Sequence, residues 1–286
     1  KVQVRLNNAV KKISKENNKI ISVETKDGVF QAKSFIFATG GVSHPETGST
    51  GDGFGWLRDL GHTVKDPTPS IVPLKLSDKW VHTLAGVSLS FMKITFYLED
   101  KKQFSKKGKI LFTHFGLSGP LILNCAKKVA DLLHEGEVTA KIDAYPDTDL
   151  GSLEKKVIKV FDANKNRTLR NAFREIAPTG TAKGLELIFS GIDFTTKVHS
   201  ITKEERKEIV QTLKALPVHI ESLMGFDRAV VADGGVILEE IDTKTMRSKL
   251  YSNLYIVGDL LHITRPSGGF SLQLCWTTGY VAGKNA

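Results

Sequence analysis

Residues 253–259 read Asn-Leu-Tyr-Ile-Val-Gly-Asp, and residues 266–271 read Pro-Ser-Gly-Gly-Phe-Ser. The first stretch is a short apolar run that ends in glycine and aspartate, which predicts a buried strand with a turn at its carboxyl end. The second predicts a glycine-rich loop that opens a helix. Residues 35–41, Phe-Ile-Phe-Ala-Thr-Gly-Gly, also form a short apolar run that ends in a glycine turn. Because ligands bind beyond the carboxyl ends of parallel strands, the two turns predict an α/β domain with a ligand site.

The residue types in these turns suit a flavin cofactor. Glycine lets the backbone approach a ligand closely, and the Asp259 carboxylate can accept hydrogen bonds from the hydroxyls of a ribityl chain. The following helix N-terminus offers backbone N–H groups to the electron-rich edge of a flavin ring. The alternatives are a plain turn with a solvated aspartate and an ordinary helix cap. The predicted cofactor-binding residues are Ala38, Thr39, Gly40, Gly41, Gly258, Asp259, Ser267, Gly268, Gly269, Phe270 and Ser271.

One expected element is absent from the sequence. No G-x-G-x-x-G follows any strand, although this fingerprint opens a dinucleotide-binding βαβ unit. The chain begins at Lys1, in an alternating pattern (Val2, Val4, Leu6) that is typical of a strand. We therefore expect an N-terminally truncated flavoprotein. The full-length protein is expected to bind FAD, whereas the truncated chain by itself could be without FAD.

The order of patterns predicts an α/β plus β fold. We expect a Rossmann-like FAD-binding domain, incomplete at its N-terminal βαβ unit, with an inserted antiparallel β subdomain and a small helical subdomain. Asp27-Gly28 predicts a hairpin, an apolar phase shift near Met92 predicts a bulge, and Thr202 with Glu205 predicts a helix N-cap. The expected segments are 1–66 (FAD-binding, first part), 67–150 (β), 151–216 (helical), 217–236 (return through the β subdomain) and 237–286 (FAD-binding, C-terminal part).

Composition is typical of a soluble globular protein, with 41% hydrophobic and 25% charged residues. No apolar run reaches the roughly 18 residues of a membrane span, so we expect no membrane partner. Cys125 and Cys275 form no metal or redox spacing, which favours a reducing compartment and a cytoplasmic location, and no metal cluster is recognisable. The net charge of +9 comes from dispersed lysine pairs, which favours a solvated surface and leaves nucleic acid as the alternative partner.

The chain resembles the YhiN-like bacterial flavoproteins, described as NAD(FAD)-utilising dehydrogenases and related to aminoacetone oxidase. The resemblance implies a Rossmann-like FAD domain interrupted by a β-barrel-like subdomain and a helical subdomain. It also implies FAD as cofactor and NAD(P)H as a candidate reductant. Two departures stand out. The family's opening G-x-G-x-x-G and its acidic ribose ligand are absent from this sequence. In addition, Phe270-Ser271 occupy positions where the family more often has Tyr-Asn, and residues 262–265 replace a more acidic spacer. The matching stretches span nearly the whole chain in the expected order: residues 38–41, 47–53, 69–74, 111–120, 234–236 and 258–283.

Three side chains are candidates for catalysis. His114 lies in a Thr-His-Phe-Gly loop, and His44 follows Gly-Gly-Val-Ser; either histidine could exchange protons near neutral pH or be structural. Arg265 could neutralise an anionic substrate or pyrophosphate, or be solvated.

The sequence therefore predicts an FAD-dependent oxidoreductase, a dehydrogenase or oxidase that transfers hydride through the flavin on an unidentified small-molecule substrate. One alternative is a flavin-dependent RNA-modifying enzyme, because the chain is basic and such enzymes share the FAD architecture. A second alternative is a non-catalytic flavin- or nucleotide-binding protein.

Overall fold

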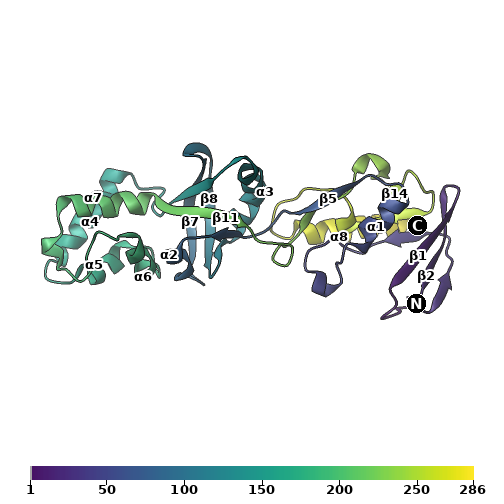
Figure 1. The fold of residues 1–286 in the computed structure, drawn as a ribbon, viewed down its shortest axis with the longest axis horizontal. Helices are drawn as coiled ribbons and strands as arrows, with labels where there is room; N and C mark the ends of the chain where they lie inside the picture. Colours follow the sequence, from purple (N-terminus) through teal and green to yellow (C-terminus); the bar gives the residue numbers. More distant parts are fainter. Residues whose placement is uncertain (1) are drawn as a thin grey trace. The chain divides into compact units, whose positions relative to one another are not determined.

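A computed structural model describes residues 2–286, which form two compact units. The first unit combines the residues up to Ile71 with Gly225–Ala286, and the second is Val72–Met224. In Figure 1 the second unit is coloured mainly teal and green, and the two sequence segments of the first unit are coloured purple to blue and yellow. β5 (Val64–Pro69) and β12 (Ala232–Val236) flank the second unit in the sequence. These two strands pair antiparallel, which brings the two sequence segments of the first unit together.

That pairing shifts the division of the chain from the one expected at residues 66 and 236. Both β5 and β12 belong to the first unit, so the division falls after Ile71 and before Gly225. A Cβ atom at Gly234 would lie 2.6 Å from the Pro67 Cα atom, so the two crossing strands touch backbone to backbone. The segment 217–236 is accordingly divided, with β11 (Leu216–Leu223) in the second unit and β12 in the first.

The first unit is built on a four-stranded sheet of order β13-β14-β15-β4, in which β15 and β4 are parallel. Its apolar core gathers Leu57, Val236, Leu254, Ile256 and Leu260, each essentially inaccessible to solvent. The strands are β4 (Phe35–Phe37), β13 (Ile241–Asp242), β14 (Arg247–Ser248) and β15 (Leu254–Ile256); the helices are η1 (Pro45–Thr47), α1 (Asp52–Asp59), η4 (Leu238–Glu240), η5 (Gly258–Leu260) and α8 (Phe270–Asn285).

A separate antiparallel sheet precedes it, formed by β1 (Val10–Glu16), β2 (Lys19–Thr25) and β3 (Gly28–Phe30). The hairpin predicted at Asp27-Gly28 is confirmed, because Thr25 pairs with Gly28. The strand predicted over residues 2–6 is wrong: these residues form no strand, and Val2, Val4 and Leu6 are at least 76% exposed. Alternation alone does not make a strand where no neighbouring strand takes up the backbone hydrogen bonds.

The second unit contains the predicted antiparallel β structure. Six strands each pair with two neighbours, so that the sheet closes on itself in the order β10-β11-β6-β9-β8-β7. The bulge predicted near Met92 is confirmed by a register shift between Leu89 and Met92, and Phe91 takes a positive φ of 60° there. The remaining strands are β6 (Leu74–Leu76), β7 (Ser88–Leu98), β8 (Lys101–Thr113), β9 (Gly116–Ser118) and β10 (Val138–Asp143).

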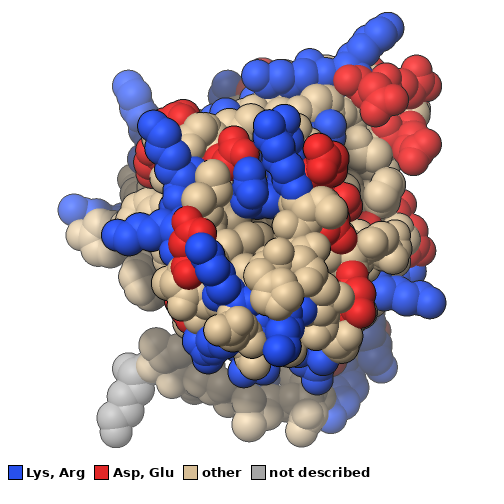
Figure 2. All heavy atoms as spheres, turned by 90° about the vertical axis from the view of Figure 1, so that its left-hand side faces the viewer, with Lys and Arg blue, Asp and Glu red and all other residues tan. Residues whose placement is uncertain are grey.

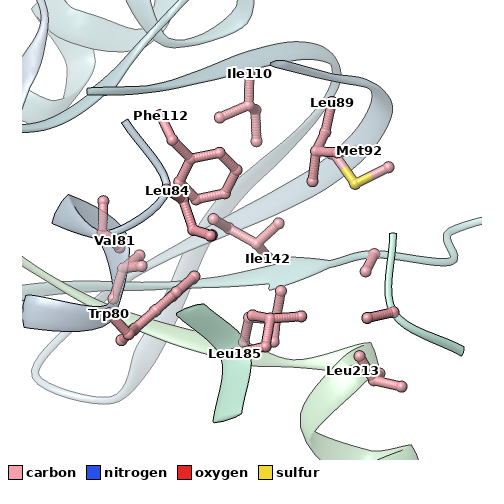
Figure 3. Packing of buried hydrophobic residues seen from close by; sticks show 14 of the residues in the cluster. Trp80, Val81, Leu84, Leu89, Met92, Ile110, Phe112, Ile142, Leu185 and Leu213 are labelled. Carbon is pink, nitrogen blue, oxygen red and sulfur yellow. The ribbon is translucent and has the colours of Figure 1, made fainter. Parts of the chain in front are cut away.

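Helices of the same unit share one apolar core with these strands. In Figure 3, Phe112 and Ile142 of the strands point toward Trp80 at the start of α2 and Leu185 of α6. The N-cap predicted at Thr202 is confirmed as a full capping box with Glu205 at the start of α7. The helices are α2 (Lys79–His82), α3 (Pro120–Glu135), α4 (Leu150–Ala163), α5 (Leu169–Ile176), α6 (Ala182–Leu185), η2 (Glu186–Ile188), η3 (Val198–Ser200) and α7 (Lys203–Lys214).

Within residues 2–286, every helix is too short or too polar to cross a membrane.

Candidate cofactor site

The two turns predicted to bind a cofactor lie side by side in the first unit. Parallel pairing aligns Phe37 with Ile256, so both strands end at the same edge of the sheet. The Val257 N–H donates to the Phe37 carbonyl oxygen at 3.1 Å, and a Cβ atom at Gly41 would lie 3.5 Å from the Asp259 Cβ atom. Segments more than 200 residues apart in the sequence thus form one edge, as expected for a ligand site of an α/β sheet.

Helix α1 packs directly against this edge. A Cβ atom at Gly53 would lie 2.1 Å from Thr39 Oγ1 and 2.8 Å from a Leu260 methyl carbon, so only glycine fits at this position. The N-cap of α1 is Gly51, with φ of 84° and no side-chain cap. The first turn of α1 therefore holds the two strand-end segments together.

Helix α8 begins where the sequence predicts a glycine-rich opening. Gly269 is its N-cap, with φ of 91°, and a Cβ atom at Gly268 or Gly269 would meet no atom within 4 Å. Farther along the helix, Thr278 Oγ1 accepts a 3.0 Å hydrogen bond from the Gly258 N–H. The backbone at the end of β15 is thereby fixed to α8, and the open N-terminus of the helix presents unpaired N–H groups.

Arg265 is buried and connects the strand end to the start of the helix. Its Nε donates to Ser271 Oγ at 2.9 Å, its Nη1 donates to the Ile263 carbonyl at 2.7 Å, and its Nη2 forms an ion pair with Asp259. The guanidinium is therefore fully engaged within the loop that joins β15 to α8. This geometry fits a residue that positions Asp259 and Ser271 better than one that meets a substrate.

Cys275 faces the same strand end from the first turns of α8. A Cβ atom at Gly258 would lie 3.3 Å from Cys275 Sγ. Burial raises the pKa of the Cys275 thiol, and the negative charge of Asp259 adds to this effect while Arg265 opposes it. Cys275 is thus a neutral thiol at neutral pH.

Of the three catalytic candidates, Arg265 and His44 lie in the first unit and His114 in the second. The His44 side chain is 45% exposed, and its Nδ1 pairs with Glu46 Oε1 at 2.9 Å. Backbone hydrogen bonding and then the hydrogen bond from His44 lower the pKa of Glu46. His114 is exposed in the turn between β8 and β9, with its ring edge-on to Phe115 at 4.9 Å.

Two polar atoms near the strand ends have unused hydrogen-bonding capacity. Among the described residues, Ser43 Oγ and His262 Nδ1 are buried and make no hydrogen bond. Ser43 follows the first glycine turn, and His262 lies in the loop that joins β15 to α8. Buried polar atoms of this kind are rare in proteins, and a bound ligand that supplies the partners would account for them. No pattern in the sequence points to either residue.

A second polar cluster in the first unit, Ser248-His62-Glu240, also has no signal in the sequence. His62 Nδ1 lies 2.7 Å from Glu240 Oε2, and His62 Nε2 lies 3.0 Å from Ser248 Oγ. The connectivity resembles a hydrolytic triad. However, Ser248 is 3% exposed and its Oγ accepts the N–H groups of Leu250 and Tyr251, so this serine cannot reach a substrate. The cluster is structural.

No three of the His, Cys, Asp and Glu side chains in residues 2–286 are arranged to hold a metal ion.

These features define an α/β domain of the kind that binds a nucleotide cofactor at its strand ends. The chain belongs to the family described as HI0933-like protein Rossmann domain, which matches residues 1–285. The family resemblance drawn from the sequence is thereby confirmed.

Curated relatives carry two kinds of name. The chain is 29% identical to a 3-dehydro-bile acid delta(4,6)-reductase of Clostridium scindens, over 90% of this chain and 63% of that protein. It is 28% identical to a ribosomal RNA dihydrouridine synthase of Haemophilus influenzae, over 95% of this chain and 64% of that protein. A protein of the same name from Escherichia coli is 26% identical, over 88% of this chain and 60% of that protein. The chain thus spans about three fifths of the length of these relatives.

Proposed function

We propose that the chain is part of an FAD-dependent oxidoreductase that acts on a small-molecule substrate. The observation that carries the proposal is the shared edge of β4 and β15, where Gly41 and Asp259 are adjacent and the open N-terminus of α8 follows. The name of the Clostridium scindens relative, a reductase, supports the same class of reaction.

The residues present fit a flavin nucleotide. Gly40 and Gly41 leave room for a ligand to approach the backbone, and the Asp259 carboxylate, 26% exposed, can accept a hydroxyl hydrogen bond. The N–H groups of Phe270 and Ser271 would bind an electron-rich ring edge. Arg265 would fix the position of Asp259 relative to the N-terminus of α8. His262 Nδ1 is available as a further hydrogen-bonding group. Bound FAD would supply hydride transfer, and NAD(P)H is the reductant we propose to test first.

The test is FAD retention by the protein as its gene encodes it. The protein is incubated with FAD and desalted, and its visible absorption spectrum is recorded. We expect a bound flavin spectrum, and we expect Asp259→Asn to lower FAD affinity at least tenfold, because the amide is a weaker acceptor and loses the ion pair with Arg265. Asp66→Asn is the matched control, since the Asp66 side chain is 91% exposed and also loses an ion pair with an arginine, Arg58, when it becomes an amide.

Either of two results would contradict the proposal: a protein that retains no flavin, or equal FAD affinity in both variants. If flavin is retained, bleaching on anaerobic addition of NADH or NADPH identifies the reductant. Retained flavin that no donor reduces and oxygen does not reoxidise would instead favour a non-catalytic flavin-binding protein.

A flavin-dependent RNA-modifying enzyme is the second candidate. Two relatives are named ribosomal RNA dihydrouridine synthases, and the chain carries a net charge of +9. Two results together would favour this candidate over the small-molecule enzyme. The protein would bind RNA with an affinity that falls steeply with salt, and the reduced flavin would be turned over only when RNA is present.

A further inference from the structure

A cleft of about 910 Å³ lies among the helices of the second unit, which does not contain the strand ends of the candidate cofactor site. Helix α5 contributes Arg170 and Arg174, α6 contributes Lys183, and the segment after α6 contributes Glu186, Asp193 and Phe194. The volume is in the range of small-molecule sites, which run from about 300 to 1,000 Å³.

Both carboxylates of the cleft are already engaged. Glu186 Oε2 accepts a 2.8 Å hydrogen bond from Arg170 Nε. Asp193 Oδ1 accepts the Thr195 hydroxyl at 2.7 Å and the Thr195 N–H at 2.8 Å, and these hydrogen bonds lower the pKa of Asp193. Asp193 is thus a satisfied carboxylate of a local turn, and Arg170 is neutralised by Glu186.

Two cations in the cleft form no ion pair, and the three cations and two carboxylates that line the cleft give it a net charge of +1. Within residues 2–286, neither Arg174 nor Lys183 has an ion-pair or hydrogen-bond partner for its side chain. A planar guanidinium can bind two oxygens of a phosphate at once, and an ammonium adds a point charge. The pair therefore provides an unused anion-binding capacity inside a concave site.

The helices that carry these cations are closely packed. A Cβ atom at Gly184 would lie 2.5 Å from a Leu84 methyl carbon and 2.7 Å from Thr83 Oγ1, so α6 is in close contact with the end of α2. Beneath α5, the rings of Phe173 and Phe194 meet edge to face at 5.2 Å. Because the cations stand on packed helices, binding of an anion to them requires little ordering of the backbone.

The remaining wall of the cleft is apolar. Ile192 and Phe194 are buried, whereas the Leu187 side chain is 59% exposed and borders the opening. A ligand with an anionic head and a flat, partly apolar body matches this combination of two cations and an apolar wall.

The surrounding surface is also basic. Residues 151–216 carry 13 Lys and Arg against 8 Asp and Glu, which is more than half of the net charge of +9. Figure 2 looks onto the side of the second unit that carries α4 to α7, and Lys and Arg are spread over much of that face with fewer Asp and Glu between them. Such a surface attracts polyanions over a Debye length, about 8–10 Å at physiological salt.

We propose that this cleft binds the phosphate group of a nucleotide, with Arg174 and Lys183 as the anion ligands and the Leu187 side as the contact for the sugar or base. The nucleotide is either free or part of an RNA strand, since both present the same phosphate chemistry. The site needs no bound flavin and is independent of the reaction at the strand ends.

The experiment measures binding of two probes to the protein as its gene encodes it: AMP by titration calorimetry, and a fluorescein-labelled single-stranded RNA decamer by anisotropy. Arg174→Gln/Lys183→Gln is expected to weaken binding at least tenfold. For RNA, the slope of log affinity against log salt is expected to fall by about 0.7 for each phosphate that the variant no longer neutralises.

Lys155→Gln/Lys159→Gln is the matched control. Both lysines are exposed on α4, and neither lines the cleft. The double variant therefore removes the same number of positive charges as the cleft variant, but at another place on the surface. We expect less than a twofold change, and an unaltered thermal midpoint in both double variants because all four side chains are exposed.

Loss of AMP and RNA binding together in the cleft variant would identify a site for a free nucleotide phosphate. Loss of RNA binding alone, with no AMP binding by the unmodified protein, would identify a site for a strand phosphodiester. No binding of either probe, or equal weakening in the cleft and α4 variants, would overturn the proposal. FAD absorbance of the same samples is expected to be unchanged, which separates this result from any outcome at the strand ends.

Discussion

The two compact units differ in how completely they bury their apolar side chains. In the second unit the closed sheet and the helices share one core, and large side chains such as Phe96, Phe112 and Phe173 are at most 1% exposed. In the first unit, Leu272, Trp276 and Tyr280 of α8 are between 59% and 69% exposed. Successive members of this set are four residues apart, so they lie on one face of the helix.

The comparison separates a unit with a continuous apolar core from the unit that contains the candidate cofactor site. The second unit has a closed sheet and a continuous core, which are features of a compact domain. The first unit has an open sheet with β4 at its edge, and its best-defined contacts hold the strand ends and the start of α8 in place. We therefore expect the first unit to unfold at lower urea concentration than the second.

The largest effect is expected from Phe173→Ala in the second unit. Phe173 is fully buried and meets the rings of Phe189 and Phe194 at 5.8 and 5.2 Å, so truncation should cost about 3–5 kcal/mol. Urea unfolding followed by Trp80 fluorescence, in a Trp56→Phe/Trp276→Phe background, isolates this unit. A loss below about 1 kcal/mol would show that the helical core is loosely packed, which would remove the contrast between the two units.

His62→Ala in the first unit should have the next largest effect. The substitution leaves Ser248 and Glu240 without their histidine partner in a site where His62 is fully buried, at a cost of about 2–4 kcal/mol. Trp56 fluorescence in a Trp80→Phe/Trp276→Phe background reports the transition. An unchanged midpoint would show that this cluster does not stabilise the unit.

The same cluster makes a pH prediction. Burial alone would raise the pKa of Glu240, but hydrogen bonds from Thr63 and His62 outweigh it and hold this pKa below its ordinary value of 4.5. The resulting stabilisation is present above pH 4.5 and is lost as the pH falls through the lower, folded-state pKa. Glu240→Gln should flatten this part of the stability profile of the first unit, measured by urea midpoints from neutral to acidic pH. Glu239→Gln, at an exposed neighbour, should leave the profile unchanged.

Gly53→Ala should have a smaller effect, confined to the edge of the sheet. The added methyl would meet Thr39 Oγ1 and Leu260, and overpacking of this kind costs about 1–3 kcal/mol. Gly55→Ala in the same helix is the control, since its Cβ atom would meet nothing within 4 Å and alanine favours a helix by up to about 1 kcal/mol. Gly53→Ala is expected to lower the urea midpoint reported by Trp56 fluorescence, and Gly55→Ala is expected to raise it. Equal shifts in the two variants would mean that α1 does not pack closely on the strand ends.

The sequence predicted the local parts of this architecture because local chemistry determines them. An apolar run followed by glycine and aspartate is sufficient to place a strand end, and the turns at Gly41 and Asp259 lie together because parallel strands share an edge. The capping box at Thr202 and the bulge near Met92 were predicted for the same reason, since each depends on residues within a few positions. These features required no knowledge of distant contacts.

Contacts between distant residues could not be predicted in this way. Ser248-His62-Glu240 joins residues that are 178 and 186 positions apart, and none of the three stands in a recognisable local motif. Arg265 was recognisable as a cationic side chain in a loop, but its engagement by Asp259 and Ser271 depends on the path of that loop. Sequence patterns therefore located the candidate site without identifying the partners that hold it.

The smallest effect is expected from Trp276→Ala on the exposed face of α8. Leu272 and Trp276 are large apolar side chains, yet within the described chain the buried residues of α8 are Thr278 and Ala282. A large side chain that is 66% exposed contributes little to folding, so we expect a change within about 0.5 kcal/mol in the free energy of unfolding.

Trp80→Ala is the matched comparison in the second unit. Trp80 is 6% exposed and its Nε1 donates to the Pro217 carbonyl oxygen at 3.2 Å, so its loss should cost about 3–5 kcal/mol. Since Trp80 itself is then absent, circular dichroism in urea is the measurement for both variants. If Trp276→Ala instead cost more than about 1 kcal/mol, the apolar face of α8 would be covered in solution. The two units would then no longer differ in how completely they bury their apolar side chains.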